Sequence, residues 1–280
     1  MNKFLILLFI LNNIWAIGLQ GLIIPQNAQI LAIANSGLAG NIDPFLNPAS
    51  NSLDKSYLQY SLNTWFADIK GSQTVYKWDK MFSNHLSIQT WNAKDLELWD
   101  NSPDDSPLGT FSTHYVAASY SASHNLNTPY NFGFRLQTIY SHLFTQSLSC
   151  ISLDFGTIIP INSHINLGAV IKNLGYEFNN KSTLPTESGI GASFNIPTLK
   201  TTLLTDLIYN IHGLEFRSAL VTNWRFINIK FGSSNSNSRN VKSTGLSINY
   251  NKWKFYYGIY FHENSNVLEP PQFFDIRLYL

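Results

Sequence analysis

Histidine, serine and acidic side chains are the groups in this 280-residue chain that could support catalysis or bind a metal. The histidines are scattered, and no HExxH motif, which would place two imidazoles on one helix face for zinc, occurs. His85 and Ser87 share one face of a predicted strand, and an outer-membrane phospholipase could use such residues. However, no G-x-S-x-G motif or suitably spaced acidic partner accompanies them. We therefore predict a protein that is not an enzyme and has no catalytic, metal or cofactor-binding residues. The histidines are His85, His114, His124, His142, His164, His212 and His262.

The longest predicted connection, residues 92–111, concentrates acidic residues. Such loops sometimes coordinate a hard cation, but this spacing matches no EF-hand, and we favour a solvated loop. The acidic residues are Asp95, Glu97, Asp100, Asp104 and Asp105.

Two further pairs of residues have structural interpretations. Asp206 and Arg217 lie on neighbouring predicted strands, where we expect a lumenal ion pair that is structural and not a ligand site. Gly189-x-Gly191 lacks the third glycine of a dinucleotide-binding fingerprint and lies within a strand. It predicts a bend or a close backbone contact.

The composition favours a membrane protein. Charged residues make up 12% of the chain, about half of the roughly 25% of a soluble domain, whereas aromatic residues reach 14%. The net charge of +1 gives no basis for binding nucleic acid. A membrane β-barrel needs few charges, because lipid covers one face of every strand and neutral polar residues can line the other.

The N-terminus is typical of an exported protein. Lys3 precedes the apolar run Phe4–Leu11, and Ala16 is a small residue suited to cleavage, so residues 1–16 are predicted to be a signal peptide. The alternative is an anchor helix, but the run is about half of the ~20 residues that a span needs. Cys150 is the only cysteine, so no intrachain disulfide can form.

From Lys55 onward, apolar and polar residues alternate repeatedly, which predicts β-strands with one apolar and one polar face. Charged residues such as Arg135 and Asp154 fall on the polar face. A soluble β-sandwich would also alternate, but the tryptophans and tyrosines near strand ends favour the aromatic girdles of a transmembrane barrel. We expect the girdle to include Trp65, Trp78, Trp91, Trp224, Tyr250 and Trp253.

The predicted fold is all-β: an outer-membrane barrel of about 14 antiparallel strands over residues 53–280. The predicted strands are 55–66, 68–78, 84–91, 113–122, 130–140, 147–159, 164–174, 187–195, 200–209, 214–224, 226–233, 243–250, 252–261 and 272–280.

The last strand carries a predicted assembly signal. Phe274, Ile276, Leu278 and Leu280 alternate up to the final residue. We expect the barrel-insertion machinery to recognise this run and the strand to pair with the first strand. A buried edge strand of a soluble fold is the alternative interpretation.

Residues 17–52 do not alternate. Gly37 and Gly40 allow close backbone contact, Pro44 and Pro48 favour extended geometry at the residues before them, and Asn47-Pro48 is a turn signal. The stretch from Ala34 to Ser50 therefore predicts a compact, bent segment that packs against something larger.

The motifs of this segment resemble those of PorV/PorQ-type outer-membrane proteins, relatives of the FadL-like barrels. Gly37-x-x-Gly40 followed by Asn47-Pro48-Ala49 resembles their N-terminal signature, which implies a plug inside the barrel. Further similarities follow in the expected order, although the turns here are unusually rich in Asn and Ser. They are Tyr60–Lys70, Leu167–Gly175, Leu184-Pro185-Thr186-Glu187 and Thr205-Asp206-Leu207.

The resemblance implies a docking or shuttle component of a type IX-style protein secretion and surface-attachment system. Its expected partners are outer-membrane lipid, the barrel-insertion machinery, and secreted cargo or other secretion components. The alternative is a FadL-like transporter that passes small hydrophobic molecules through the lumen and a lateral gap. Both imply the outer membrane of a Gram-negative-type bacterium.

Overall fold

The computed structural model describes residues 20–50, 55–98, 107–125, 130–143, 146–179, 183–237, 239–262 and 269–280. The predicted signal peptide, residues 1–16, lies outside this part of the chain.

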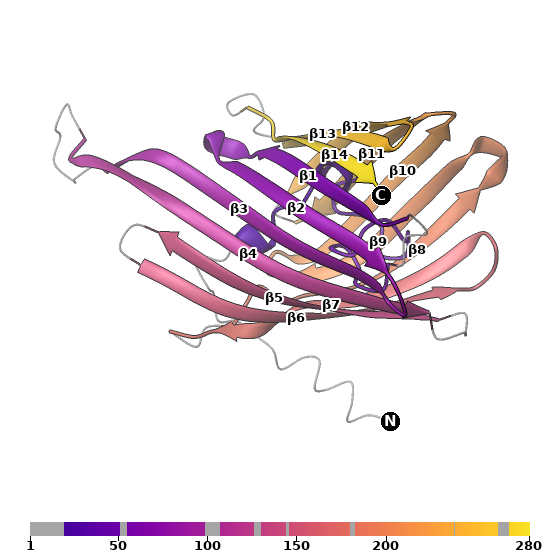
Figure 1. Ribbon diagram of the computed structural model, residues 1–280, viewed down its shortest axis with the longest axis horizontal. Helices are drawn as coiled ribbons and strands as arrows, with labels where there is room; N and C mark the ends of the chain where they lie inside the picture. Colours follow the sequence, from indigo (N-terminus) through magenta and orange to yellow (C-terminus); the bar gives the residue numbers. More distant parts are fainter. Residues whose placement is uncertain are drawn as a thin grey trace.

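Fourteen antiparallel strands form a closed barrel in which each strand pairs with its neighbours in sequence and β1 pairs with β14 (Figure 1). The predicted all-β barrel is therefore confirmed, and the sandwich alternative is wrong. The strands are β1 (Tyr57–Thr64), β2 (Lys70–Asp79), β3 (Ser83–Leu98), β4 (Gly109–Asn125), β5 (Asn131–Leu143), β6 (Gln146–Pro160), β7 (Ile165–Glu177), β8 (Glu187–Ile196), β9 (Thr201–Asn210), β10 (Gly213–Trp224), β11 (Ile227–Ser236), β12 (Asn240–Tyr250), β13 (Trp253–His262) and β14 (Gln272–Tyr279).

The two ends of the barrel differ in their connections. We call the end that holds the start of β1, the end of β14 and the β2–β3 and β12–β13 turns the short-turn end. The opposite end, here the long-connection end, holds the β3–β4, β7–β8 and β13–β14 connections. Short turns on one side and longer loops on the other are typical of outer-membrane barrels.

Alternation along each strand separates an apolar exterior from a mostly polar lumen. On β1, Leu58, Tyr60 and Leu62 are exposed, whereas the intervening Gln59 and Ser61 are buried. The same phase buries the strand charges Arg135, Asp154, Lys230 and Arg277, as the pattern predicted. Within the described residues, no helix is long and apolar enough to cross a membrane.

The aromatic girdle is only partly as predicted. Trp224, Tyr250 and Trp253 are exposed at the short-turn end. Trp91 and Trp65 are corrections: Trp91 is buried in the lumen in phase with Gln89, and Trp65 packs against the same interior cluster. Both rings pack against apolar side chains inside the barrel and do not lie at the lipid interface.

The β3–β4 hairpin corrects the predicted loop at residues 92–111. β3 pairs with β2 as far as Lys70↔Asn92, and β4 pairs with β5 from Thr113↔Leu143. Past these residues, β3 and β4 pair only with each other, as far as Leu98↔Gly109. The ribbon projects past its neighbours (Figure 1). Asp95 lies in a bulge with φ 54° and Glu97 lies in the strand, because Leu96 and Phe111 continue the pairing. Asp100, Asp104 and Asp105 lie outside the described residues. Likewise, β11 continues through Ser236, past the end of the predicted strand 226–233.

Placing a charge on the lipid-facing surface should destabilise the barrel according to depth. Ile276→Arg, near the middle of β14, is expected to cost ~2–4 kcal/mol in unfolding free energy, whereas Tyr250→Arg at the barrel rim should cost ~0–1 kcal/mol. Unfolding of the two variants in lipid vesicles, followed by tryptophan fluorescence, measures both values. Equal costs would contradict the assignment of this face to lipid.

Candidate functional site: a plugged lumen with an apolar chamber

The N-terminal segment, residues 20–50, lies inside the barrel and is almost entirely buried (Figure 1). It contains a 3-10 turn, η1 (Gln20–Leu22), and one short helix, α2 (Ala28–Leu31). Asn27 caps this helix, because its side-chain oxygen accepts the Ile30 N–H at 3.0 Å. We call residues 26–50 the belt, because they follow the inner wall.

As the chain runs from residue 26 to residue 50, the belt contacts the strands from β14 back to β4. The Ala28 N–H donates to both oxygens of Asp275 on β14, at 3.0 and 3.1 Å. Arg217 on β10 then donates to the Asn35 carbonyl at 3.4 Å, and Asp206 on β9 accepts the N–H groups of Gly37 and Leu38. Ser193 on β8 donates to the Ala39 carbonyl at 3.1 Å, and Ser123 on β4 to the Ser50 carbonyl at 3.4 Å. Buried backbone groups that would otherwise lack partners are thus satisfied by the wall.

Glycines on the wall make room for the belt. Three pairs stand directly opposite each other on neighbouring strands: Gly133↔Gly156, Gly168↔Gly191 and Gly245↔Gly258. A Cβ at any of these six positions would meet belt atoms, for example the Ala28 carbonyl oxygen 2.6 Å from the added Cβ of Gly258. The belt backbone therefore lies in shallow grooves that any side chain would fill. A Cβ at Gly191 would meet the Asp206 carboxylate and the Leu38 side chain, so this glycine leaves room for the side chains that hold the belt.

The predicted plug-motif residues lie along the same path. Asn47 donates through Nδ2 to the Leu38 carbonyl at 2.7 Å and to the Thr157 carbonyl of β6 at 3.1 Å. Its oxygen accepts the Ala49 N–H at 3.0 Å, which fixes the turn through Pro48. Gly37 has φ +113°, where a side chain would be strained, and Gly40 packs against Leu204.

Contacts across the lumen close the belt into a ring. Asn27 donates to Asp43 at 2.9 Å, and Gln29 donates to the Ile42 carbonyl at 3.0 Å. The belt also forms an apolar cluster with wall residues, among them Val75 and Leu204. Its belt members are Ile30, Ile33, Phe45 and Leu46.

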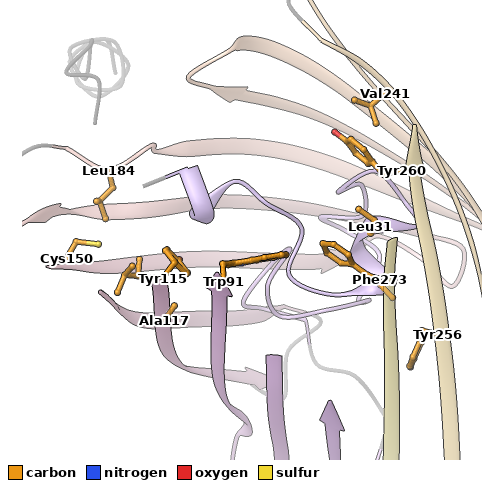
Figure 2. Close-up of a cluster of buried hydrophobic side chains, with 12 residues drawn as sticks. Leu31, Trp91, Tyr115, Ala117, Cys150, Leu184, Val241, Tyr256, Tyr260 and Phe273 are labelled. Atoms are coloured by element: carbon orange, nitrogen blue, oxygen red, sulfur yellow. The ribbon is translucent and has the colours of Figure 1, made fainter. Parts of the chain in front are cut away.

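A cluster of buried apolar side chains extends through the lumen from the belt toward the long-connection end. Trp91 and Phe273 have ring centroids 5.8 Å apart, and Tyr115 and Tyr260 belong to the same cluster (Figure 2). Leu22 and Ile24 of the N-terminal segment pack against it. Because lumens of outer-membrane barrels are usually polar, this wall is unusual. We call the cluster the aromatic chamber. Its buried members are Ala28, Leu31, Trp91, Tyr115, Ala117, Ile139, Cys150, Leu184, Val241, Tyr256, Tyr260 and Phe273.

A charged wall stands on the β7–β10 side. Arg217 pairs with Glu187 at 2.9 Å and with Glu215 at 3.0 Å, while Lys172 pairs with Glu187 at 2.5 Å. Ser234 donates to Glu215. A void of about 40 Å³ separates this wall from Leu22–Gln26, which is room for about one water.

The predicted Asp206–Arg217 ion pair is therefore corrected. The two residues are register partners on β9 and β10, and both are buried, as expected. However, Asp206 binds the belt N–H groups and Arg217 pairs with the two glutamates. Two acceptors for the guanidinium and two amide donors for the carboxylate satisfy both charges better than one shared contact.

The structure gives His85 and Ser87 no catalytic arrangement. Ser87 pairs with Ser119 at 2.7 Å between hydroxyl oxygens, and His85 contacts the Tyr57 ring. Among the described residues, no group of three or more His, Cys, Asp or Glu side chains could hold a metal ion. The C-terminal Phe274, Ile276, Leu278 and Leu280 face outward on or just after β14, and their role as an assembly signal stays a prediction.

Together, the fold and the lumen define a class: a 14-stranded membrane β-barrel with an internal N-terminal plug. The sequence matches no protein-family model and no curated protein. Among solved structures, the chain is similar to the Ralstonia pickettii toluene transporter TbuX, with a TM-score of 0.68 and 8% identity over 91% of this chain and 98% of that one. It is also similar to the Pseudomonas putida toluene transporter TodX, with a TM-score of 0.65 and 10% identity over 90% and 96%.

A further similarity is to the monoaromatic hydrocarbon channel CymD, with a TM-score of 0.62 and 9% identity over 90% of this chain and 96% of that one. At these identities the likeness establishes the fold alone. The expected FadL-like barrel is thus confirmed as a fold, and the narrower PorV/PorQ resemblance is not shown.

Proposed function

We propose that this protein passes small hydrophobic molecules across the outer membrane. The observation that carries the proposal is the aromatic chamber, where the lumen is lined by Trp91, Tyr115, Tyr260 and Phe273 instead of polar side chains. An apolar site with few polar groups is the usual form of a binding site for small apolar ligands. The shared fold of the toluene transporters supports the same assignment.

The long-connection end would then face the outside of the cell and the short-turn end the periplasm. A molecule would enter the aromatic chamber from outside and displace Leu22 and Ile24, which now pack against its wall. The belt would separate the chamber from the periplasm. An exported chain with a signal peptide at residues 1–16 belongs to this proposal, as does insertion by the barrel-insertion machinery.

A docking or shuttle role in protein secretion is the second candidate. Two observations favour it: the void beside residues 22–26 measures about 40 Å³, too small for a hydrocarbon ring, and the β3–β4 ribbon offers an external protein surface. In that role the barrel would be a platform for secreted cargo or other secretion components, and the lumen would stay closed.

Uptake of radiolabelled toluene by liposomes containing the purified protein separates the two functions. Transport predicts saturable uptake that falls in a Phe273→Asp variant, because a buried carboxylate would make the chamber wall polar. Leu199→Asp, in the exposed β8–β9 turn outside the lumen, is the matched control, checked for normal folding. Uptake no faster than in empty liposomes, together with specific co-purification of secreted proteins from membranes, would favour docking instead.

A further inference from the structure

The lumenal faces of β2 and β3 differ from the rest of the inner wall. The glycine grooves and the carboxylate anchors that hold the belt lie on β5–β9 and β11–β14, with additional hydrogen bonds from β1, β4 and β10. On β2 and β3, the lumenal row presents Gln73, Ser87, Gln89 and Trp91, all at most 3% exposed, while Val75 of β2 packs against the apolar cluster of the belt. The plug is therefore held at β2 and β3 without a glycine groove or a carboxylate anchor.

Several buried polar atoms on this face have no hydrogen-bond partner. Gln73 and Gln89 are register partners on β2 and β3, and neither the amide nitrogen nor the amide oxygen of either residue is paired. The Trp91 indole nitrogen, one lumenal position further along β3, is also unpaired. Each unmet buried group lowers stability by its desolvation cost, and Gln73, Gln89 and the Trp91 indole hold the plug without side-chain hydrogen bonds.

The position of the two glutamines connects the aromatic chamber to the short-turn end. Trp91, beside Gln89 on the lumenal row, belongs to the chamber wall. In the other direction, the row continues through Ser87, whose hydroxyl pairs with Ser119 at 2.7 Å, to His85. A row of buried polar side chains on β3 thus runs from the chamber toward the short-turn end, with Val75 of β2 opposite Ser87.

We propose that the plug parts from the barrel wall along β2 and β3, and that solute leaves the aromatic chamber through this seam toward the short-turn end. Opening the seam would allow water to reach the unpaired amides of Gln73 and Gln89, which compensates for the lost contact. Elsewhere the belt keeps its hydrogen bonds to Asp206 and Asp275. The identity of the solute rests on the proposed function, whereas the location of the seam does not.

Thiol labelling tests the location directly in the full-length protein. In a Cys150→Ala background, Ser87→Cys places a thiol on the seam, and Ser193→Cys places one on β8 under the belt. Both serines are 3% exposed. We expect a small water-soluble maleimide to label Ser87→Cys about tenfold faster, because local opening exposes β3 and not β8.

A second variant ties the effect to the glutamines. Adding Gln73→Met and Gln89→Met removes the unpaired amides while nearly preserving their shape, so labelling of Ser87→Cys should fall to the rate of Ser193→Cys. Thr74→Met, beside Gln73 on the lipid-facing side of β2, should leave the rate unchanged. All variants are first checked for heat-modifiable migration, the sign of a folded barrel.

Labelling of Ser193→Cys that equals or exceeds that of Ser87→Cys would overturn the seam, as would an unchanged Ser87→Cys rate in the methionine variant. Absence of toluene uptake in the unmodified protein would count against the proposed function alone, because the labelling rates do not depend on the solute.

Discussion

Removal of Leu278–Leu280 is expected to abolish accumulation of the folded barrel. Leu278 and Tyr279 pair with Leu58 and Tyr57 of β1, and the Leu280 N–H donates to the Ser56 carbonyl at 2.9 Å. Without them, part of β1 has no partner on β14 and exposes backbone groups to hydrocarbon, where each unsatisfied group costs several kcal/mol. Heat-modifiable protein in isolated outer membranes, quantified on gels, measures the loss.

The matched control keeps the chain length and replaces side chains only. Leu278→Ala with Leu280→Ala preserves the backbone pairing with β1, so much of the folded barrel should remain if closure is the main requirement. An equal loss in this variant would instead favour side-chain recognition by the insertion machinery. A truncated chain that accumulates normally would contradict both interpretations.

Gly133→Ala is expected to displace the C-terminal end of the belt from the barrel wall. The added Cβ would overlap the Pro48 carbonyl and approach the Ala49 nitrogen, both backbone atoms that cannot rotate away. Overpacking of this kind costs ~1–3 kcal/mol, and here the belt can relieve it by moving off the wall. Ion conductance in planar bilayers should therefore rise about tenfold over that of the unmodified protein, since displacement leaves a largely polar lumen open.

Gly109→Ala is the control for this experiment, because no atom lies within 4 Å of the position its Cβ would take. It should leave the conductance unchanged. If Gly133→Ala also leaves it unchanged while the protein is folded, then the glycine grooves do not hold the plug in place.

The barrel itself could be predicted because alternation is a local property of the sequence. Leu58, Tyr60 and Leu62 show their common face without knowledge of any other strand. The small residues of the belt were also visible, since Gly37, Gly40 and Pro48 interrupt the alternation. What could not be predicted was the wall that receives them. Gly133 and Gly156 form a groove only through the β5–β6 register, which the sequence does not specify directly.

The aromatic chamber was missed for a different reason. Trp91 was expected in the lipid-facing girdle because tryptophans are frequent at membrane interfaces. Its phase with Ser87 and Gln89 places it in the lumen, so the alternation was the better guide than residue type. Likewise, Asp206 and Arg217 are neighbours as predicted, but the choice of partner depends on the belt amides and on Glu187 and Glu215.

The central claim is that the aromatic chamber, on the long-connection side of the belt, binds small apolar molecules. Soaking crystals of the purified protein in bromobenzene and mapping the anomalous scattering of bromine tests it most directly. The account predicts a bromine peak inside the barrel, among Trp91, Tyr115 and Phe273, with Leu22 and Ile24 displaced. Bromine peaks confined to the outer, lipid-facing surface, with the chamber still filled by Leu22 and Ile24, would contradict it.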